Sequence, residues 1–118
     1  MSAPNLLVTA NCYGNTTLAS LTTVTANVLT NTSSSNSVIK LNTVVLANYS
    51  GSAVTANVLM NRSSTAYYIG GTVSIPANST LVLLAKDTVT YMIEGDVLQA
   101  NVSANTAVSL MCSYETLS

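Results

Sequence analysis

The chain has 118 residues, of which 48% are hydrophobic and only 6% are charged, and its formal net charge is −1. This length suits a single domain, which we place over residues 1–118, and the scarcity of Lys and Arg leaves too little positive charge to hold the phosphates of a nucleic acid. The absence of histidine removes the commonest general base and the commonest metal ligand.

Stretches that alternate apolar and small polar side chains follow one another along the chain, which is typical of β-strands with one buried face. No stretch carries the apolar spacing of a helix, so helix should be nearly absent. The expected strands are Leu6–Asn11, Thr22–Thr30, Val38–Ala47, Val54–Asn61, the two joined segments Ala66–Ile69 and Thr72–Ile75, Thr80–Ala85, Thr88–Ile93, Val97–Ala104 and Val108–Tyr114.

Turn signals separate these segments. The Gly-Asn pair predicts a turn within Cys12–Thr17, and Tyr49–Ser52 predicts a tight connection that makes a hairpin of the strands on either side. We expect Gly70–Gly71 to form a bulge or bend, and Glu94–Asp96 to form a sharp turn.

Eight or nine short strands at regular spacing predict an all-β fold, a single antiparallel β-sandwich. We favour an immunoglobulin-like Greek key, with a jelly roll as the alternative. The Cys, Trp, Cys arrangement of antibody domains is missing, because the chain has no Trp.

One segment recurs thirty positions later almost unchanged, as Val24–Asn31 and Val54–Asn61. Either a hairpin unit was duplicated, or two neighbouring strands face the same core with similar residues. We favour the second interpretation, and one pair of copies gives no support for a solenoid.

The few charged groups form no recognisable catalytic motif. The carboxylates of Asp87, Glu94 and Asp96 could surround Ca²⁺, but their spacing matches no loop with a defined ligand order, so we interpret them as solvated turn acids and expect no metal or cofactor. The Ser and Thr hydroxyls have no evident base, and neither Lys40 nor Lys86 lies in a Ser-Lys motif. We therefore expect a protein that is not an enzyme.

The two cysteines, Cys12 and Cys112, lie near opposite ends of the chain. The first and last strands of a sandwich can be neighbours, so a disulfide is geometrically conceivable. We favour free thiols, because Cys112 is in phase with the apolar Val108 and Leu110 and the chain begins without a secretory signal, which points to synthesis in a cytoplasm.

Four residues are candidates for contact with a partner protein. Tyr67 and Tyr68 adjoin on a strand, so one should pack inward while the other exposes its ring. Met60 could supply an apolar knob to a partner, and Arg62 could supply a cation that makes two hydrogen bonds. The simpler interpretation is that these residues only form an exposed turn.

No apolar stretch approaches the ~20 residues that span a bilayer as a helix, so we expect no membrane contact. Triplets of the form Asn-x-Ser/Thr are frequent, but in a chain this rich in these residues we interpret them as chance. They begin at Asn15, Asn31, Asn48, Asn61, Asn78 and Asn101.

Four stretches, Val54–Ile69, Val73–Leu83, Tyr91–Asp96 and Ser113–Glu115, resemble small virion structural proteins of tailed bacteriophages, particularly those of cyanobacterial and marine hosts. The likeness spans nearly the whole chain. It implies a short all-β protein without enzymatic activity that is incorporated into the particle, and it carries over no functional residue.

A neutral surface and assembly without export fit the resemblance. The expectation is a capsid decoration protein in the virion, a homotrimer by analogy, whose partner is the major capsid protein or another virion protein. A tail, neck or fibre-associated protein is the alternative. A carbohydrate-binding attachment module is a further alternative, which would need an exposed aromatic platform.

Overall fold

A computed structural model describes residues 12–85, 90–104 and 108–117, and this part of the chain is all β. The nine strands of these residues are β1 (Cys12–Ser20), β2 (Ala26–Thr30), β3 (Val38–Asn48), β4 (Val54–Arg62), β5 (Thr65–Ile75), β6 (Ser79–Leu84), β7 (Thr90–Met92), β8 (Val97–Val102) and β9 (Val108–Leu117). No helix long and apolar enough to cross a membrane occurs in the described ranges.

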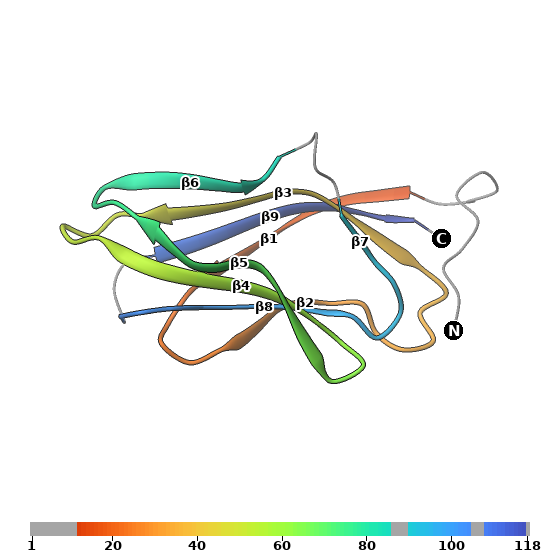
Figure 1. The fold of residues 1–118 in the computed structure, drawn as a ribbon. Helices are drawn as coiled ribbons and strands as arrows, with labels where there is room; N and C mark the ends of the chain where they lie inside the picture. Colours follow the sequence, from red (N-terminus) through yellow and green to blue (C-terminus); the bar gives the residue numbers. More distant parts are fainter. Residues whose placement is uncertain (1–11, 86–89, 105–107, 118) are drawn as a thin grey trace.

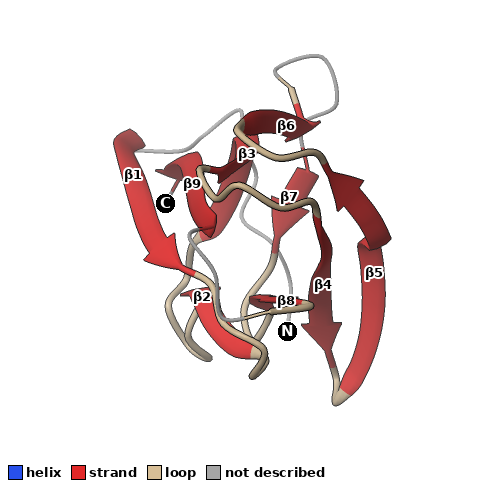
Figure 2. Ribbon diagram, turned by 90° about the vertical axis from the view of Figure 1, so that its left-hand side faces the viewer, coloured by secondary structure: helices blue, strands red, loops and turns tan. Residues whose placement is uncertain are grey.

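The strands form two antiparallel sheets that face each other as a sandwich (Figures 1 and 2). Sheet A has the order β1-β9-β3-β6, with the short β7 also paired to β3, and sheet B has the order β2-β8-β4-β5. The expected antiparallel β-sandwich is therefore confirmed.

The pairing is nested: β1 with β9, β2 with β8, β3 with β6 and β7, and β4 with β5. A long antiparallel hairpin wrapped into two sheets has this order, which is that of a jelly roll. The favoured immunoglobulin-like Greek key is wrong and its alternative is correct. Strand periodicity cannot decide between them, because both topologies use similar strands and differ only in which distant strands pair.

The hairpin expected across Tyr49–Ser52 is also wrong, because β3 lies in sheet A and β4 in sheet B. Buried Asn48 holds this crossover. Its Nδ2 lies 2.9 Å from the carbonyl oxygen of Ser52 and 3.1 Å from those of Ile75 and Pro76, while its Oδ1 accepts from the Ser50 amide. One buried amide thus joins two loops at one end of the sandwich.

Several predicted boundaries change. Cys12–Thr17 is not a turn but belongs to β1, which pairs with β9 without a register shift, so Gly14 simply lies opposite Glu115. Gly70–Gly71 is an irregularity within one continuous β5, as predicted, with register shifts around Val58. A Cβ at Gly70 would approach Leu83 Cδ1 to 2.8 Å, so a larger residue there would have to displace the Leu83 side chain. The strand expected at 6–11 lies outside the described residues.

The core lies between the sheets and follows the predicted alternation. Leu98, Ala100 and Val102 of β8 are buried, as are Val108, Leu110 and Cys112 of β9. The buried Leu41, Val44 and Leu46 of β3 complete its centre.

Both cysteines are free thiols, Cys12 exposed and Cys112 buried. Cys112 lies opposite Thr17, and Cys12 lies five residues further along β1, about 17 Å at ~3.3 Å per residue. The disulfide is excluded by this register, and the alternative of a buried Cys112 thiol is confirmed.

The two copies of the repeat lie on either side of β8, as parts of β2 and β4. They are therefore not neighbours. In β4 Ala56 and Val58 are buried, whereas the equivalent Ala26 is exposed and Val28 is half-buried at the sheet edge. Similar sequences thus serve an edge strand and a central strand, and only the second copy faces the core fully.

Candidate functional site

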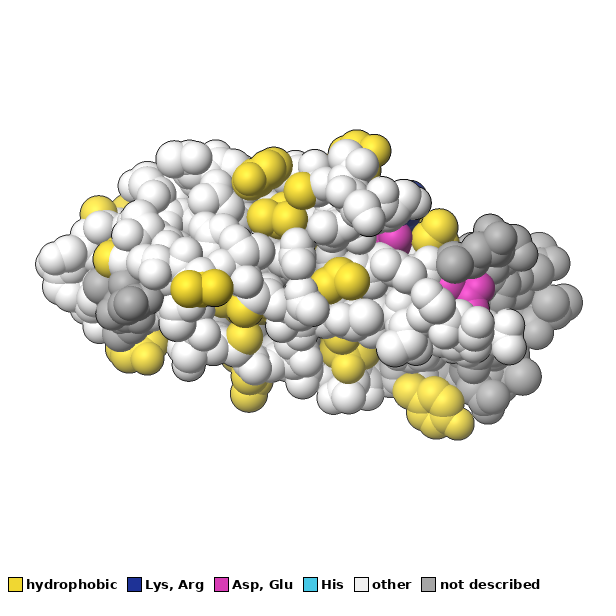
Figure 3. All heavy atoms as spheres, turned by 90° about the horizontal axis from the view of Figure 1, so that it is seen from below, with side chains coloured by type: hydrophobic (Ala, Val, Ile, Leu, Met, Phe, Trp, Pro, Cys, Tyr) yellow, Lys and Arg dark blue, Asp and Glu magenta, His cyan; other side chains and the backbone are white. Residues whose placement is uncertain are grey.

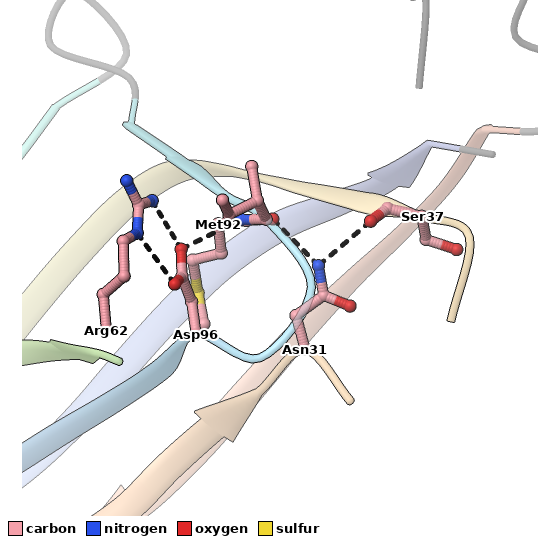
Figure 4. Close-up of polar contacts among 6 residues, drawn as sticks. Asn31, Ser37, Arg62, Met92 and Asp96 are labelled. Carbon is pink, nitrogen blue, oxygen red and sulfur yellow. Dashed lines mark hydrogen bonds and ion pairs between the residues drawn. The ribbon is translucent and has the colours of Figure 1, made fainter. Parts of the chain in front are cut away.

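An ion pair with the buried carboxylate of Asp96 fixes the half-exposed side chain of Arg62 at the end of β4 (Figure 4). The Asp96 side chain is 1% exposed, and its two carboxylate oxygens accept hydrogen bonds from Arg62 Nε at 2.8 Å and Nη2 at 2.5 Å. The Ile93 amide also donates to Asp96 Oδ2 at 2.9 Å. A buried carboxylate requires such partners, so Asp96 is a structural anchor and the prediction of a solvated turn acid is wrong for it.

The neighbouring loop closes around this pair through Asn31, which is buried (Figure 4). Asn31 Nδ2 donates to the carbonyl oxygens of Ser37 at 3.1 Å and Met92 at 2.9 Å. The Gly95 amide donates to the Asn31 carbonyl, and the Asn31 amide donates to that of Asp96. The loop after β2 and the turn before β8 therefore form one polar cluster.

Glu94 and Asp96, the two predicted turn acids that the structure describes, each have their own partner in the protein. Glu94 accepts a hydrogen bond from the Asn36 amide at 2.8 Å, Asp96 is paired with Arg62, and Asp87 lies outside the described residues. Within residues 12–85, 90–104 and 108–117, no group of three or more His, Cys, Asp or Glu could hold a metal ion.

A groove of about 470 Å³ brings the four predicted contact residues together. We call it the tyrosine groove and define it by its lining residues, Met60, Arg62, Tyr67, Tyr68, Ile69, Thr90 and Tyr91. Residues from β4 and β5 of sheet B meet residues of β7 of sheet A here. Sequence reasoning missed Tyr91, because nothing local connects it with Tyr67.

The roles expected for these residues need correction. Tyr67 and Tyr68 are 59% and 63% exposed, so neither packs inward. They belong to the half of β5 that is exposed at the edge of sheet B. Met60 lies opposite Tyr67 and is only 7% exposed, so it belongs to the wall of the groove and is not a projecting knob.

The bidentate face of Arg62 is occupied by Asp96 and not by a partner. The hydrogen bonds that Arg62 donates to Asp96 raise the pKa of Arg62. They outweigh the opposing effect of partial desolvation, and the charge of Asp96 and the neighbouring Tyr67 add to the rise, so the guanidinium stays charged. Its Nη1 group makes no hydrogen bond within the part of the chain that the structure describes. Among the described residues, Nη1 is therefore a donor group held in place at the groove.

A second feature lies on the outer face of sheet A, where the register aligns four apolar side chains across four strands. Leu18 pairs with Met111, Met111 with Val45, and Val45 with Val82. We call these residues the apolar row. Leu18, Met111 and Val82 are 73%, 48% and 57% exposed, while Val45 is half-buried.

Small uncharged side chains border the apolar row. On one side lie Ser20, Ser109, Ala47 and Thr80, and on the other lie Thr16, Ser113 and Thr43. A hollow of about 390 Å³ lies along Leu18, Val45 and Met111. The Lys40–Glu115 pair, at 3.8 Å, lies further along β3 and β9.

The outer face of sheet B carries a polar counterpart, which we call the polar row. Asn101 Nδ2 donates to Thr25 Oγ1 at 2.7 Å, Asn57 Nδ2 donates to Asn101 Oδ1 at 3.0 Å, and the Thr72 amide donates to Asn57 Oδ1 at 2.7 Å. In Figure 3, which views this side, white polar and backbone atoms prevail and apolar side chains form separate small groups.

The two thiols lack the character of nucleophiles. The hydrogen bond to Glu115 raises the pKa of Cys12, and burial raises the pKa of Cys112 to about 11. Because the thiolate is the reactive form, the raised pKa values leave both cysteines mostly in the less reactive thiol form near neutral pH.

No protein-family model matches this chain, and no curated protein matches its sequence. Function has to be inferred from the tyrosine groove and the two sheet faces themselves.

Proposed function

We propose that the protein is a non-enzymatic virion structural protein, a capsid decoration protein that attaches to the assembled shell through the outer face of sheet A. The apolar row is the observation that carries this proposal. It places three exposed large apolar side chains, Leu18, Met111 and Val82, in line across one sheet face without a charged residue among them.

The chemistry of this face suits a permanent protein contact. Complete burial of a Leu, Met or Val side chain contributes about 1.5–3 kcal/mol, so covering the apolar row supplies a substantial part of an association free energy. The bordering Ser and Thr hydroxyls can hydrogen-bond to a partner without the cost of desolvating a charge. Apolar contact at the centre with a polar rim is the usual anatomy of a protein interface.

The charged and sulfur groups support a role without catalysis. Glu94, Asp96 and Glu115 each accept hydrogen bonds from the protein itself, and both thiols are held protonated. Jelly rolls occur in viral capsid proteins and in lectins, so the fold is compatible with this function but does not select it.

Attachment would stabilise the shell by linkage. A protein that binds the assembled shell and not its separate subunits lowers the free energy of the assembled state alone. In this proposal the partner is the major capsid protein or another virion protein. By analogy with other decoration proteins the attached form is a homotrimer, with the apolar row directed at the shell.

The first test is a copy count by quantitative mass spectrometry of purified particles. A decoration protein should be present at on the order of hundreds of copies, as the symmetry of a shell requires. A count of a few to tens would replace this role with a tail, neck or fibre-associated one, and absence from the particle would refute a virion role.

The second test places one positive charge on either face. Leu18→Lys should abolish attachment to particles that lack the protein, because the ammonium group would be desolvated in the contact. Asn27→Lys puts the same charge on the exposed edge of sheet B and should leave attachment unchanged. Equal attachment of the two variants would refute the assignment of sheet A as the contact.

A further inference from the structure

We infer that the tyrosine groove, together with the hollow that adjoins it at Arg62, binds a neutral oligosaccharide. This site shares no residue with the apolar row, so the inference is independent of the proposed shell contact.

The aromatic residues of the chain are concentrated in this groove. The chain has six Tyr and no Trp or Phe, and three of the six, Tyr67, Tyr68 and Tyr91, line the one groove. Tyr91 is 41% exposed, so all three side chains present surface to a ligand. An amphipathic phenol ring packs against the C–H face of a sugar, and its hydroxyl can hydrogen-bond to the ring substituents.

A second hollow, of about 340 Å³, adjoins the tyrosine groove at Arg62. It is lined by Arg62, Ser63, Ile93, Glu94, Gly95 and Asp96. One hollow therefore offers aromatic surface and the next offers hydroxyl, carboxylate and backbone groups. A chain of sugar units, which carry C–H faces and hydroxyl groups on every ring, can use both.

Arg62 connects the two hollows as a donor that is already in position. Its Nε and Nη2 are held by Asp96, while Nη1 makes no hydrogen bond within the described ranges. A side chain fixed before binding loses little further conformational freedom when a ligand hydroxyl accepts from it.

The charges of the site favour a neutral ligand over an acidic one. The positive charge of Arg62 is paired with Asp96, and Glu94 adds a negative charge to the same hollow. A uronate or sulfate would meet this carboxylate. Aromatic grooves also take proline-rich peptides, but such peptides offer few hydroxyl groups to the polar hollow beside this one.

The experiment is a calorimetric and NMR titration of the full chain with cellohexaose, maltohexaose, mannohexaose and chitohexaose. An oligogalacturonate and a proline-rich peptide serve as the acidic and peptide probes. We expect at least one neutral hexasaccharide to bind, and Tyr68→Ala and Tyr91→Ala each to weaken it about tenfold. The controls Tyr13→Ala and Tyr49→Ala remove rings outside the groove that are about as exposed as Tyr68 and more exposed than Tyr91, and they should leave binding unchanged.

Three outcomes would overturn the inference: no neutral saccharide binds up to about 10 mM, only the acidic or the peptide probe binds, or binding survives both groove substitutions. Circular dichroism of each variant confirms that it is folded. Leu18→Lys should bind the saccharide as the wild type does. The saccharide site and the shell contact are therefore tested independently of each other.

Discussion

The two outer faces of the sandwich are each crossed by an aligned row of side chains, and the rows have opposite chemistry. On sheet B, Asn101 and Asn57 bond to each other and to Thr25 and the Thr72 amide, so the polar row satisfies itself within one molecule. On sheet A, Leu18 and Met111 belong to a row that is largely exposed. The two nearly uncharged faces therefore differ: the side chains of sheet B form hydrogen bonds with one another, whereas sheet A exposes apolar surface that a partner could bury.

The two ion pairs also differ between the sheets, and substituting Arg62 of the pair on sheet B should have the largest effect on stability. Arg62→Met should lower the free energy of unfolding by about 3–5 kcal/mol, because it leaves the buried Asp96 carboxylate unpaired. Lys40→Met is the matched control on sheet A, where both partners of the Lys40–Glu115 pair are about one-third exposed, and it should cost less than about 1 kcal/mol. Urea unfolding measures both, and equal losses would contradict the contrast.

Adjacent residues of β9 separate the inside of sheet A from its outside. Leu110→Ala should cost about 2–5 kcal/mol, because Leu110 is fully buried in the core. Met111→Ala should stay within about 0.5 kcal/mol, because Met111 points outward in the apolar row. Thermal and urea unfolding test this pair. A large loss for Met111→Ala would mean that the row serves folding and not a partner.

The strand pattern was enough to predict which side chains of β8 and β9 face inward, since a strand has only two faces. The jelly-roll order was not predictable in the same way. It depends on pairings such as that of Thr17 with Cys112, which lie far apart in the sequence. The apolar row has the same origin, because Leu18, Val45 and Met111 form a row only once the register is fixed.

At the candidate site, the sequence identified Met60, Arg62, Tyr67 and Tyr68 but not how they are arranged. Asp96 has the local signature of an exposed turn acid beside Gly95, and only the tertiary structure places it where it must pair with Arg62. Asn31 and Asn48 likewise match the chance Asn-x-Ser/Thr pattern, yet both are buried hydrogen-bond centres. Polar burial depends on what the rest of the chain places around a residue, which no local pattern records.

The inner side of sheet A also predicts a pH dependence. Burial raises the pKa of Cys112 from 9.0 to about 11, so the folded protein holds this proton more tightly than the unfolded chain. The protonated Cys112 thiol thereby contributes roughly 2–3 kcal/mol to the free energy of unfolding. This contribution is fully present below pH 9 and is lost as the pH rises from 9 to 11. Urea unfolding of wild type and Cys112→Val over this range, under reducing conditions, isolates it. If both proteins lose stability equally, Cys112 is not the cause.

The polar row provides the mildest change. Asn101 joins both halves of the row, since its Nδ2 donates to Thr25 and its Oδ1 accepts from Asn57. Asn101→Ala should cost about 1 kcal/mol, because these side chains are partly hydrated and water replaces much of what is lost. Asn27→Ala removes the hydrogen bond of 2.8 Å that Gln99 Nε2 donates to Asn27 Oδ1 at the exposed edge, and it should cost less. A negligible effect of Asn101→Ala in urea unfolding would mean that the row only hydrates sheet B, and that the two faces differ in exposed apolar area but not in internal bonding.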